Sequence, residues 1–278
     1  MLSQRSIVVP SVYFRTMQTN GSPTLLQRIG RLLRAKQFLV FYAIGLFALL
    51  YVPPLATGWL RDHRPLDVLV RDSNALLADL WARHSLLIAL IIAVSIVLQT
   101  WFRAGYLRSL LGRLHWGPVD GRQFRRLLGL MVTLELIAWG TSAAAVALGL
   151  SSDDVTLDTR TQLLVLGLVL VQLLVAVALL YADYAIVVSS VTLLQSVRRS
   201  LDTVRANRLV SLLAVGLSLV IFDMTTSALS GIQGAGTAIL PSIVILIVVR
   251  GALSFVLDVV LIAVYIDTIE RRGTQRDD

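Results

Sequence analysis

The stretch ILIVVRGALSFVLDVVLIAVYI, residues 245–266, is apolar except for Arg250, Ser254 and Asp258. About 20 mainly apolar residues form a helix long enough to cross the hydrocarbon core of a membrane. The stretch therefore predicts a membrane-spanning helix, although it carries a cation and an anion eight residues apart. Charges inside a membrane are costly unless they are paired, so the fold must provide partners for both.

The composition of the whole chain has the same character. Its 278 residues are 56% hydrophobic and 15% charged, whereas a soluble domain is about half apolar and about a quarter charged. The composition predicts an all-α fold, a polytopic membrane helix bundle. The formal net charge of +8 fits basic loops beside membrane spans and anionic lipid better than nucleic acid. The chain has no cysteine, which excludes disulfides and thiolate chemistry.

Long apolar runs predict six transmembrane helices joined by polar loops and accompanied by short amphipathic helices at the membrane surface. The predicted spans are residues 38–60, 86–104, 127–150, 163–188, 209–230 and 243–266. Pro53 and Pro54 interrupt the outer half of the first span, because proline removes a backbone donor and clashes with the preceding turn. A further short helix is expected at residues 73–83, in the first loop.

The distribution of basic residues predicts the orientation of these spans. Of the 25 Lys and Arg residues, 19 lie on the side of the two termini, five lie in loops on the opposite side, and Arg250 lies within a span. Basic loops stay in the cytoplasm, so both termini are predicted to be cytoplasmic. The predicted organisation is a cytoplasmic N-terminal segment (1–37), a membrane domain (38–266) and a cytoplasmic tail (267–278).

Two basic amphipathic helices are expected on the cytoplasmic side. In TLLQRIGRLLRAKQF, Leu25, Leu26, Ile29, Leu32 and Leu33 form an apolar stripe opposite the basic residues. The second, TLLQSVRRSLDTVRANR, repeats the pattern with Leu194, Val197, Leu201 and Val204. Such helices lie on anionic membrane surfaces.

Nine arginines are candidate contacts to anionic lipid or to a cytoplasmic protein partner, and the alternative is that they serve only as positive-inside anchors. They are Arg28, Arg31, Arg34, Arg122, Arg125, Arg126, Arg198, Arg199 and Arg205.

Two segments resemble a known family. DYAIVVSSVTLLQSVRRSLDTVRANRL (residues 183–209) and FRAGYLRSLLGRLHWGPVDGRQFRRLL (residues 102–128) are similar to loops of the glycerophosphoryl diester phosphodiesterase membrane-domain family and related uncharacterised bacterial membrane proteins. Ser189 stands where that family often has an acid. The resemblance implies a membrane module in a bacterial cytoplasmic membrane. It does not carry over the phosphodiesterase activity, which belongs to a fused barrel of about 200–250 residues.

The ionisable residues within the predicted spans form the second candidate site. Counting about 1.5 Å per residue from the cytoplasmic ends places Asp223 and Arg250 at about 21 and 24 Å, which predicts an ion pair between them. Ser254 and Asp258 follow Arg250 at helical spacing and share its face. Glu135 lies at the depth of Asp258, whereas Asp183 is expected to be hydrated near the inner interface.

Two functions remain open. The first is a non-enzymatic membrane module, a scaffold or accessory subunit that engages lipid or a partner through its basic helices. The alternative is a transporter or lipid-handling protein with a polar path lined by Arg250, Asp258, Glu135 and Asp223. A water-filled cavity reaching Asp258 and Glu135 would favour the alternative. No catalytic constellation is found, and no cofactor, metal or nucleic acid is expected.

Overall fold

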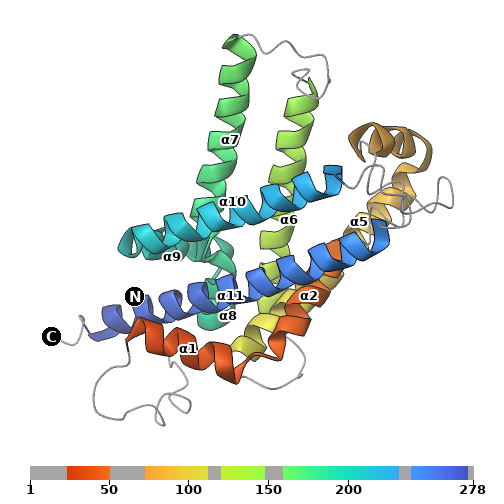
Figure 1. The fold of residues 1–278 in the computed structure, drawn as a ribbon. Coiled ribbons are helices and arrows are strands. Elements are labelled where there is room, and N and C mark those ends of the chain that lie inside the picture. The colour runs from red at the N-terminus through yellow and green to blue at the C-terminus, as the bar shows by residue number, and fades with distance from the viewer. Residues whose placement is uncertain (1–23, 51–72, 112–119, 148–158, 232–238, 275–278) are drawn as a thin grey trace.

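The computed structural model of the protein describes residues 24–50, 73–111, 120–147, 159–231 and 239–274 (Figure 1). All regular structure in these ranges is helical. The helices are α1 (Leu25–Ala35), α2 (Leu39–Leu50), α5 (Ser73–Leu110), α6 (Gly121–Ala147), α7 (Thr159–Leu179), α8 (Ala182–Ser189), α9 (Leu193–Ala206), α10 (Arg208–Gly231) and α11 (Ile239–Thr274).

Several of these helices are long and apolar enough to cross a membrane. Three segments meet this description, namely Ser85–Leu110, Leu166–Ser189 and Ile243–Arg271. The number within the described residues rises to five if each of two bent helix pairs forms one span. α6 covers most of the third predicted span but is not among these candidates, and Pro53 and Pro54 lie outside the described residues. The helical fold with several helices apolar enough to span a membrane is thus confirmed, whereas the count of six stays a prediction.

Helix boundaries differ from the predicted ones where the chain continues a helix past the apolar run. The short helix expected at 73–83 is the first part of α5, which continues without a break to Leu110. The predicted cytoplasmic tail begins inside α11, which reaches Thr274. At these positions polar residues therefore extend the helices beyond the apolar runs instead of forming loops.

The long helices are arranged in a ring. Each helix contacts the next in the order α2, α5, α6, α7, α10 and α11, and α11 contacts α2. In Figure 1, α6 and α7 stand upright beside each other, whereas α10 and α11 run across the view. α8 contacts α5, α6, α9 and α11, and α1 lies along α11. The short helices therefore join the long ones at one end of the ring.

The tightly packed core lies at that same end. Four tyrosines, Tyr106, Tyr181, Tyr184 and Tyr265, are at most 1% exposed there, and the rings of Tyr181 and Tyr265 stack at 6.4 Å. Elsewhere the long helices expose large apolar side chains, such as Leu86 on α5, Leu174 on α7, Leu213 on α10 and Ile245 on α11. Soluble monomers rarely expose such extensive apolar surfaces, so these faces are those expected to meet lipid.

A glycine allows the closest helix crossing. A Cβ atom added at Gly251 of α11 would lie 2.5 Å from the Cα of Ile44 in α2. Ala43, the preceding residue of α2, is 1% exposed. Small residues let helix backbones approach closely in membranes, where packing rather than the hydrophobic effect drives association. α2 and α11 are therefore packed backbone to backbone at this position.

The first amphipathic helix, α1, is present and docks on the bundle. The Thr24 side chain accepts a hydrogen bond from the Gln27 backbone N–H, and the Gln27 side chain accepts one from the Thr24 backbone. This capping box satisfies donors at the start of the helix. Leu25, Ile29 and other members of the predicted stripe pack against the core, whereas Leu26 is 81% exposed. α1 then meets α2 at a bend of 80°.

The second amphipathic helix, α9, buries a face other than its apolar stripe. Its fully buried residues are Ser196, Ser200 and Thr203, while Leu194 of the predicted apolar stripe is exposed. The face of α9 that packs on the protein is therefore the small polar one, and the predicted contact of the apolar stripe with the membrane surface stays a prediction. Small polar side chains allow α9 to pack closely on α8, and Leu194 points away from the protein. α9 meets α10 at a bend of 108°.

Candidate functional site

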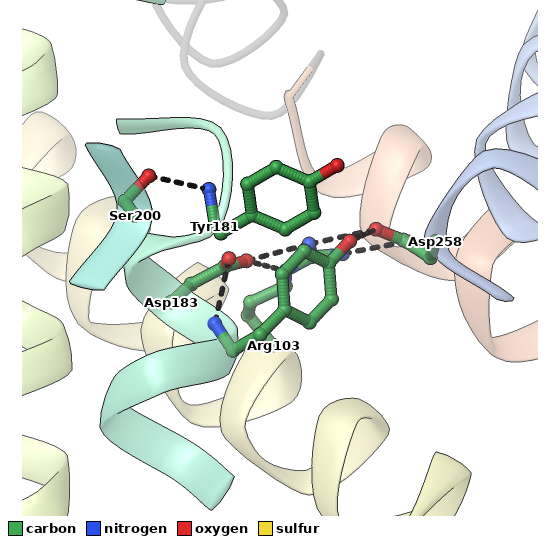
Figure 2. A network of polar contacts seen from close by, with 6 residues as sticks. Arg103, Tyr181, Asp183, Ser200 and Asp258 are labelled. Atoms are coloured by element: carbon green, nitrogen blue, oxygen red, sulfur yellow. Dashed lines mark hydrogen bonds and ion pairs between the residues drawn. The ribbon is translucent and has the colours of Figure 1, made fainter. Parts of the chain in front are cut away.

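The candidate site begins at a break between α7 and α8. A helix start leaves backbone N–H groups without intrahelical partners, and the N–H of Tyr181 donates to the Ser200 hydroxyl of α9 at 2.9 Å. Asp183 follows in the first turn of α8, where the helix dipole favours a negative charge. Its Oδ1 accepts a hydrogen bond from the Tyr184 backbone N–H at 2.8 Å. The break thus presents Asp183 toward the bundle interior (Figure 2).

Arg103 of α5 links this aspartate to one on α11. Its Nη2 lies 2.7 Å from Asp183 Oδ2, and its Nη1 lies 2.7 Å from Asp258 Oδ2. Further bonds run from Nε to Asp183 at 3.1 Å and from Nη2 to Asp258 Oδ1 at 2.8 Å. Figure 2 shows the guanidinium between the two carboxylates. The planar fork of arginine suits such bidentate contacts, and here it joins three helices.

Two tyrosines complete the surroundings of this cation. The Tyr184 hydroxyl donates to Asp258 Oδ1. The Arg103 Cζ lies 5.5 Å from the ring centroid of Tyr106 and 5.8 Å from that of Tyr184, distances typical of cation–π contacts. The group formed by Arg103, Asp183, Asp258 and Tyr184 is called the Arg103 cluster below.

The cluster is largely removed from solvent. The side chains of Arg103, Asp183 and Asp258 are 19%, 14% and 8% exposed, respectively. Charges buried in this way depend on their partners, because removing one partner leaves an uncompensated charge. The Arg103 cluster therefore holds the C-terminal part of α5, the start of α8 and the middle of α11 together.

Two members of this cluster differ from the prediction. Arg103, at the end of the predicted span 86–104, was counted with the basic residues on the side of the termini, but it points into the bundle and pairs with Asp183 and Asp258. Asp183 was expected to be hydrated, but it is paired with Arg103. A signal was present, because the predicted spans contained four acids, Glu135, Asp183, Asp223 and Asp258, against Arg250, and Arg103 itself lies at the end of the predicted span 86–104. This excess of acids called for a further cation near the inner ends of the spans.

A cavity of about 150 Å³ lies beside the cluster. Four helices contribute to its walls, which are formed by Ala43, Leu46, Phe47, Gln99, Arg103, Met131, Ser254 and Asp258. Ser254 and Asp258, predicted to share one face of their helix, thus both line this cavity. Arg250, one turn before Ser254, places its Cζ 4.9 Å from the ring centroid of Phe47.

The other predicted intramembrane residues lie apart from the cluster. Glu135 of α6 is half-buried, and no hydrogen bond or ion pair of this side chain is seen among the described residues. The side chain of Asp223 lies outside the described part of the chain. The ion pair between Asp223 and Arg250 therefore stays a prediction.

The nine candidate arginines differ in their surroundings. Arg28 pairs with Glu270 of α11 at 2.7 Å, and Arg126 donates to the backbone carbonyl of Ser190. The latter residue ends α8 in the left-handed conformation, with φ of 49°. Arg199 is half-buried. The remaining six are exposed on α1, α6 and α9, namely Arg31, Arg34, Arg122, Arg125, Arg198 and Arg205.

No protein-family model, curated protein or solved structure matches the chain. The fold and the site alone define its class, which is a helical protein with several helices apolar enough to span a membrane and a buried arginine shared by two aspartates. The resemblance to the phosphodiesterase membrane-domain family stays a prediction.

Proposed function

We propose that the chain is a six-span protein of a bacterial cytoplasmic membrane with both termini in the cytoplasm. It acts as a non-catalytic membrane module, a scaffold or accessory subunit, that engages anionic lipid through its basic surface helices. The resemblance noted from the sequence and the excess of basic residues on one side support this assignment.

The observation that carries the proposal is the placement of α1 and α9. Each helix turns sharply into the next one, at 80° and 108°, and each packs one face on the bundle. The opposite faces expose Arg31 and Arg34 on α1 and Arg198 and Arg205 on α9. A basic helix that crosses the end of a span lies at the depth of lipid head groups, where each arginine near an anionic surface contributes about 1 kcal/mol.

Native mass spectrometry of the protein in mild detergent tests this proposal. The purified protein is titrated with phosphatidylglycerol and, separately, with phosphatidylcholine. We expect the fourfold variant R31Q/R34Q/R198Q/R205Q to lose most of its preference for phosphatidylglycerol, by up to about 1 kcal/mol for each arginine.

The matched control replaces two arginines that are engaged within the protein. The variant R28Q/R126Q should be less stable to heat, because it loses the contacts to Glu270 and Ser190. Its preference for phosphatidylglycerol should be nearly unchanged. A fourfold variant that retains the wild-type preference would show that α1 and α9 do not bind anionic lipid.

The cavity beside Asp258 favours a second candidate, a transporter or lipid-handling protein. The cavity reaches Asp258 and Ser254, although Glu135 is not part of its wall. Because the chain has no cysteine, the variant S254C gives a clean test in intact cells. Labelling of this residue by a membrane-impermeant maleimide supports a water-filled path, and complete protection supports the packed module.

A further inference from the structure

The cavity beside the Arg103 cluster combines a polar end with apolar walls. Its polar side chains are Gln99 and Arg103 on α5 and Ser254 and Asp258 on α11. Its apolar side chains are Ala43, Leu46, Phe47 and Met131. Sites for small molecules commonly join apolar walls to a few polar groups that orient the ligand.

The polar end of the cavity carries an excess of negative charge. One guanidinium faces two carboxylates, those of Asp183 and Asp258, and the Tyr184 hydroxyl that donates to Asp258 is neutral. Charges interact strongly in a site with few water molecules. With both carboxylates ionised, the cluster is therefore short of one positive charge.

The other charged groups around the cavity do not supply this charge at the Asp258 end. Arg250 lies over Phe47 and is about 12 Å from Asp258 along α11. Glu135 of α6 is not part of the cavity wall, and as an acid it supplies no positive charge. The local field therefore favours a cation over an anion.

The acceptor groups at this end of the cavity can also take further hydrogen bonds from a cation that carries N–H groups. Asp258 Oδ1 accepts from both Arg103 and Tyr184, whereas the one hydrogen bond seen for Oδ2 among the described residues comes from Arg103 Nη1. A carboxylate oxygen accepts about two hydrogen bonds, so Oδ2 retains capacity for another. The Ser254 hydroxyl and the Gln99 amide carbonyl line the same cavity and are further acceptors.

We infer that this cavity binds a small aliphatic ammonium ion. The ammonium group donates to Asp258, Ser254 and Gln99, and the aliphatic tail lies against Leu46, Phe47 and Met131. A cavity of 150 Å³ admits a ligand about the size of benzene, which corresponds to a primary amine with four or five carbons. This binding site goes beyond the proposed role of the surface helices and does not depend on it.

Thermal unfolding in mild detergent with three matched probes tests this inference. n-Butylammonium, n-butanol and butyrate share the tail and differ in the charge of the head group. At a concentration one hundred times its Kd, n-butylammonium should raise the Tm by about 5 °C or more. n-Butanol should have a much smaller effect, and butyrate should give no rise.

Cavity variants locate the effect. S254L fills the polar end of the cavity and should abolish the rise caused by n-butylammonium. The control S218L makes the same change on α10, where the hydrogen bond of Ser218 in the described part of the chain goes to Ala214 of its own helix, and should keep the full rise. Should S254L fail to fold, Q99L removes the other neutral acceptor and should reduce the rise at least twofold.

Three results would overturn the inference. These are no rise with n-butylammonium, an equal rise with butyrate or n-butanol, and a full rise in S254L or, where that variant does not fold, in Q99L. The first two results leave the lipid preference of the surface helices unaffected, so failure here is distinguishable from failure of the proposed function.

Discussion

At the scale of single residues, the chain satisfies buried polar groups with side chains from helices distant in sequence. The clearest example after the Arg103 cluster is the N–H of Tyr181 at the break between α7 and α8. Its acceptor is the hydroxyl of Ser200, which is fully buried on α9. A single hydroxyl therefore joins the broken end of one span to a surface helix.

Replacing this hydroxyl should be costly. S200A leaves a buried backbone N–H without an acceptor, so we expect the free energy of unfolding to fall by about 1–3 kcal/mol. The measurement is unfolding of the detergent-solubilised protein by sodium dodecyl sulfate. S218A is the matched control, because the bond of Ser218 seen among the described residues stays within its own helix, so its loss should cost little. Equal losses in both variants would show that the Ser200 contact contributes nothing specific.

At the scale of helices, much of the secondary structure could be predicted and most of the packing could not. Apolar runs and capping residues are local signals, so α1, α9 and the long helices were predicted near their actual positions. The buried face of α9 was not predictable, because Ser196, Ser200 and Thr203 are buried only when a neighbour approaches closely. Arg103 was missed for the same reason, since its partners lie on helices far away in the sequence.

Close approach of helices also makes the crossing of α2 and α11 sensitive to one methyl group. We expect G251A to destabilise the protein by about 1–3 kcal/mol, because the new Cβ would overlap the backbone at Ile44. The matched control is G216A on α10, where an added Cβ meets nothing within 4 Å. That change should be neutral or stabilise by up to about 1 kcal/mol, because alanine favours helix. A G251A variant as stable as G216A would contradict the close crossing.

At the scale of the whole molecule, the ring of long helices is packed most tightly at the end that carries α1, α8 and α9. The proposed topology places this end in the cytoplasm. We therefore expect reporter fusions at Arg122 and Arg205 to read cytoplasmic and a fusion at Asp154 to read extracytoplasmic. A cytoplasmic reading at Asp154 would rule out the six-span topology, whatever the internal packing.

The packing of the whole molecule depends on Arg103, which is buried and shared by Asp183 and Asp258. The most direct measurement is a double-mutant cycle on the free energy of unfolding with R103Q, D258N and the double variant. Removing one partner of a buried pair costs about 3–5 kcal/mol, and R103Q should cost more than D258N because it strands two carboxylates. The double variant should cost less than the sum of the single variants by about 0.5–3 kcal/mol. Strictly additive losses would show that Arg103 and Asp258 do not interact.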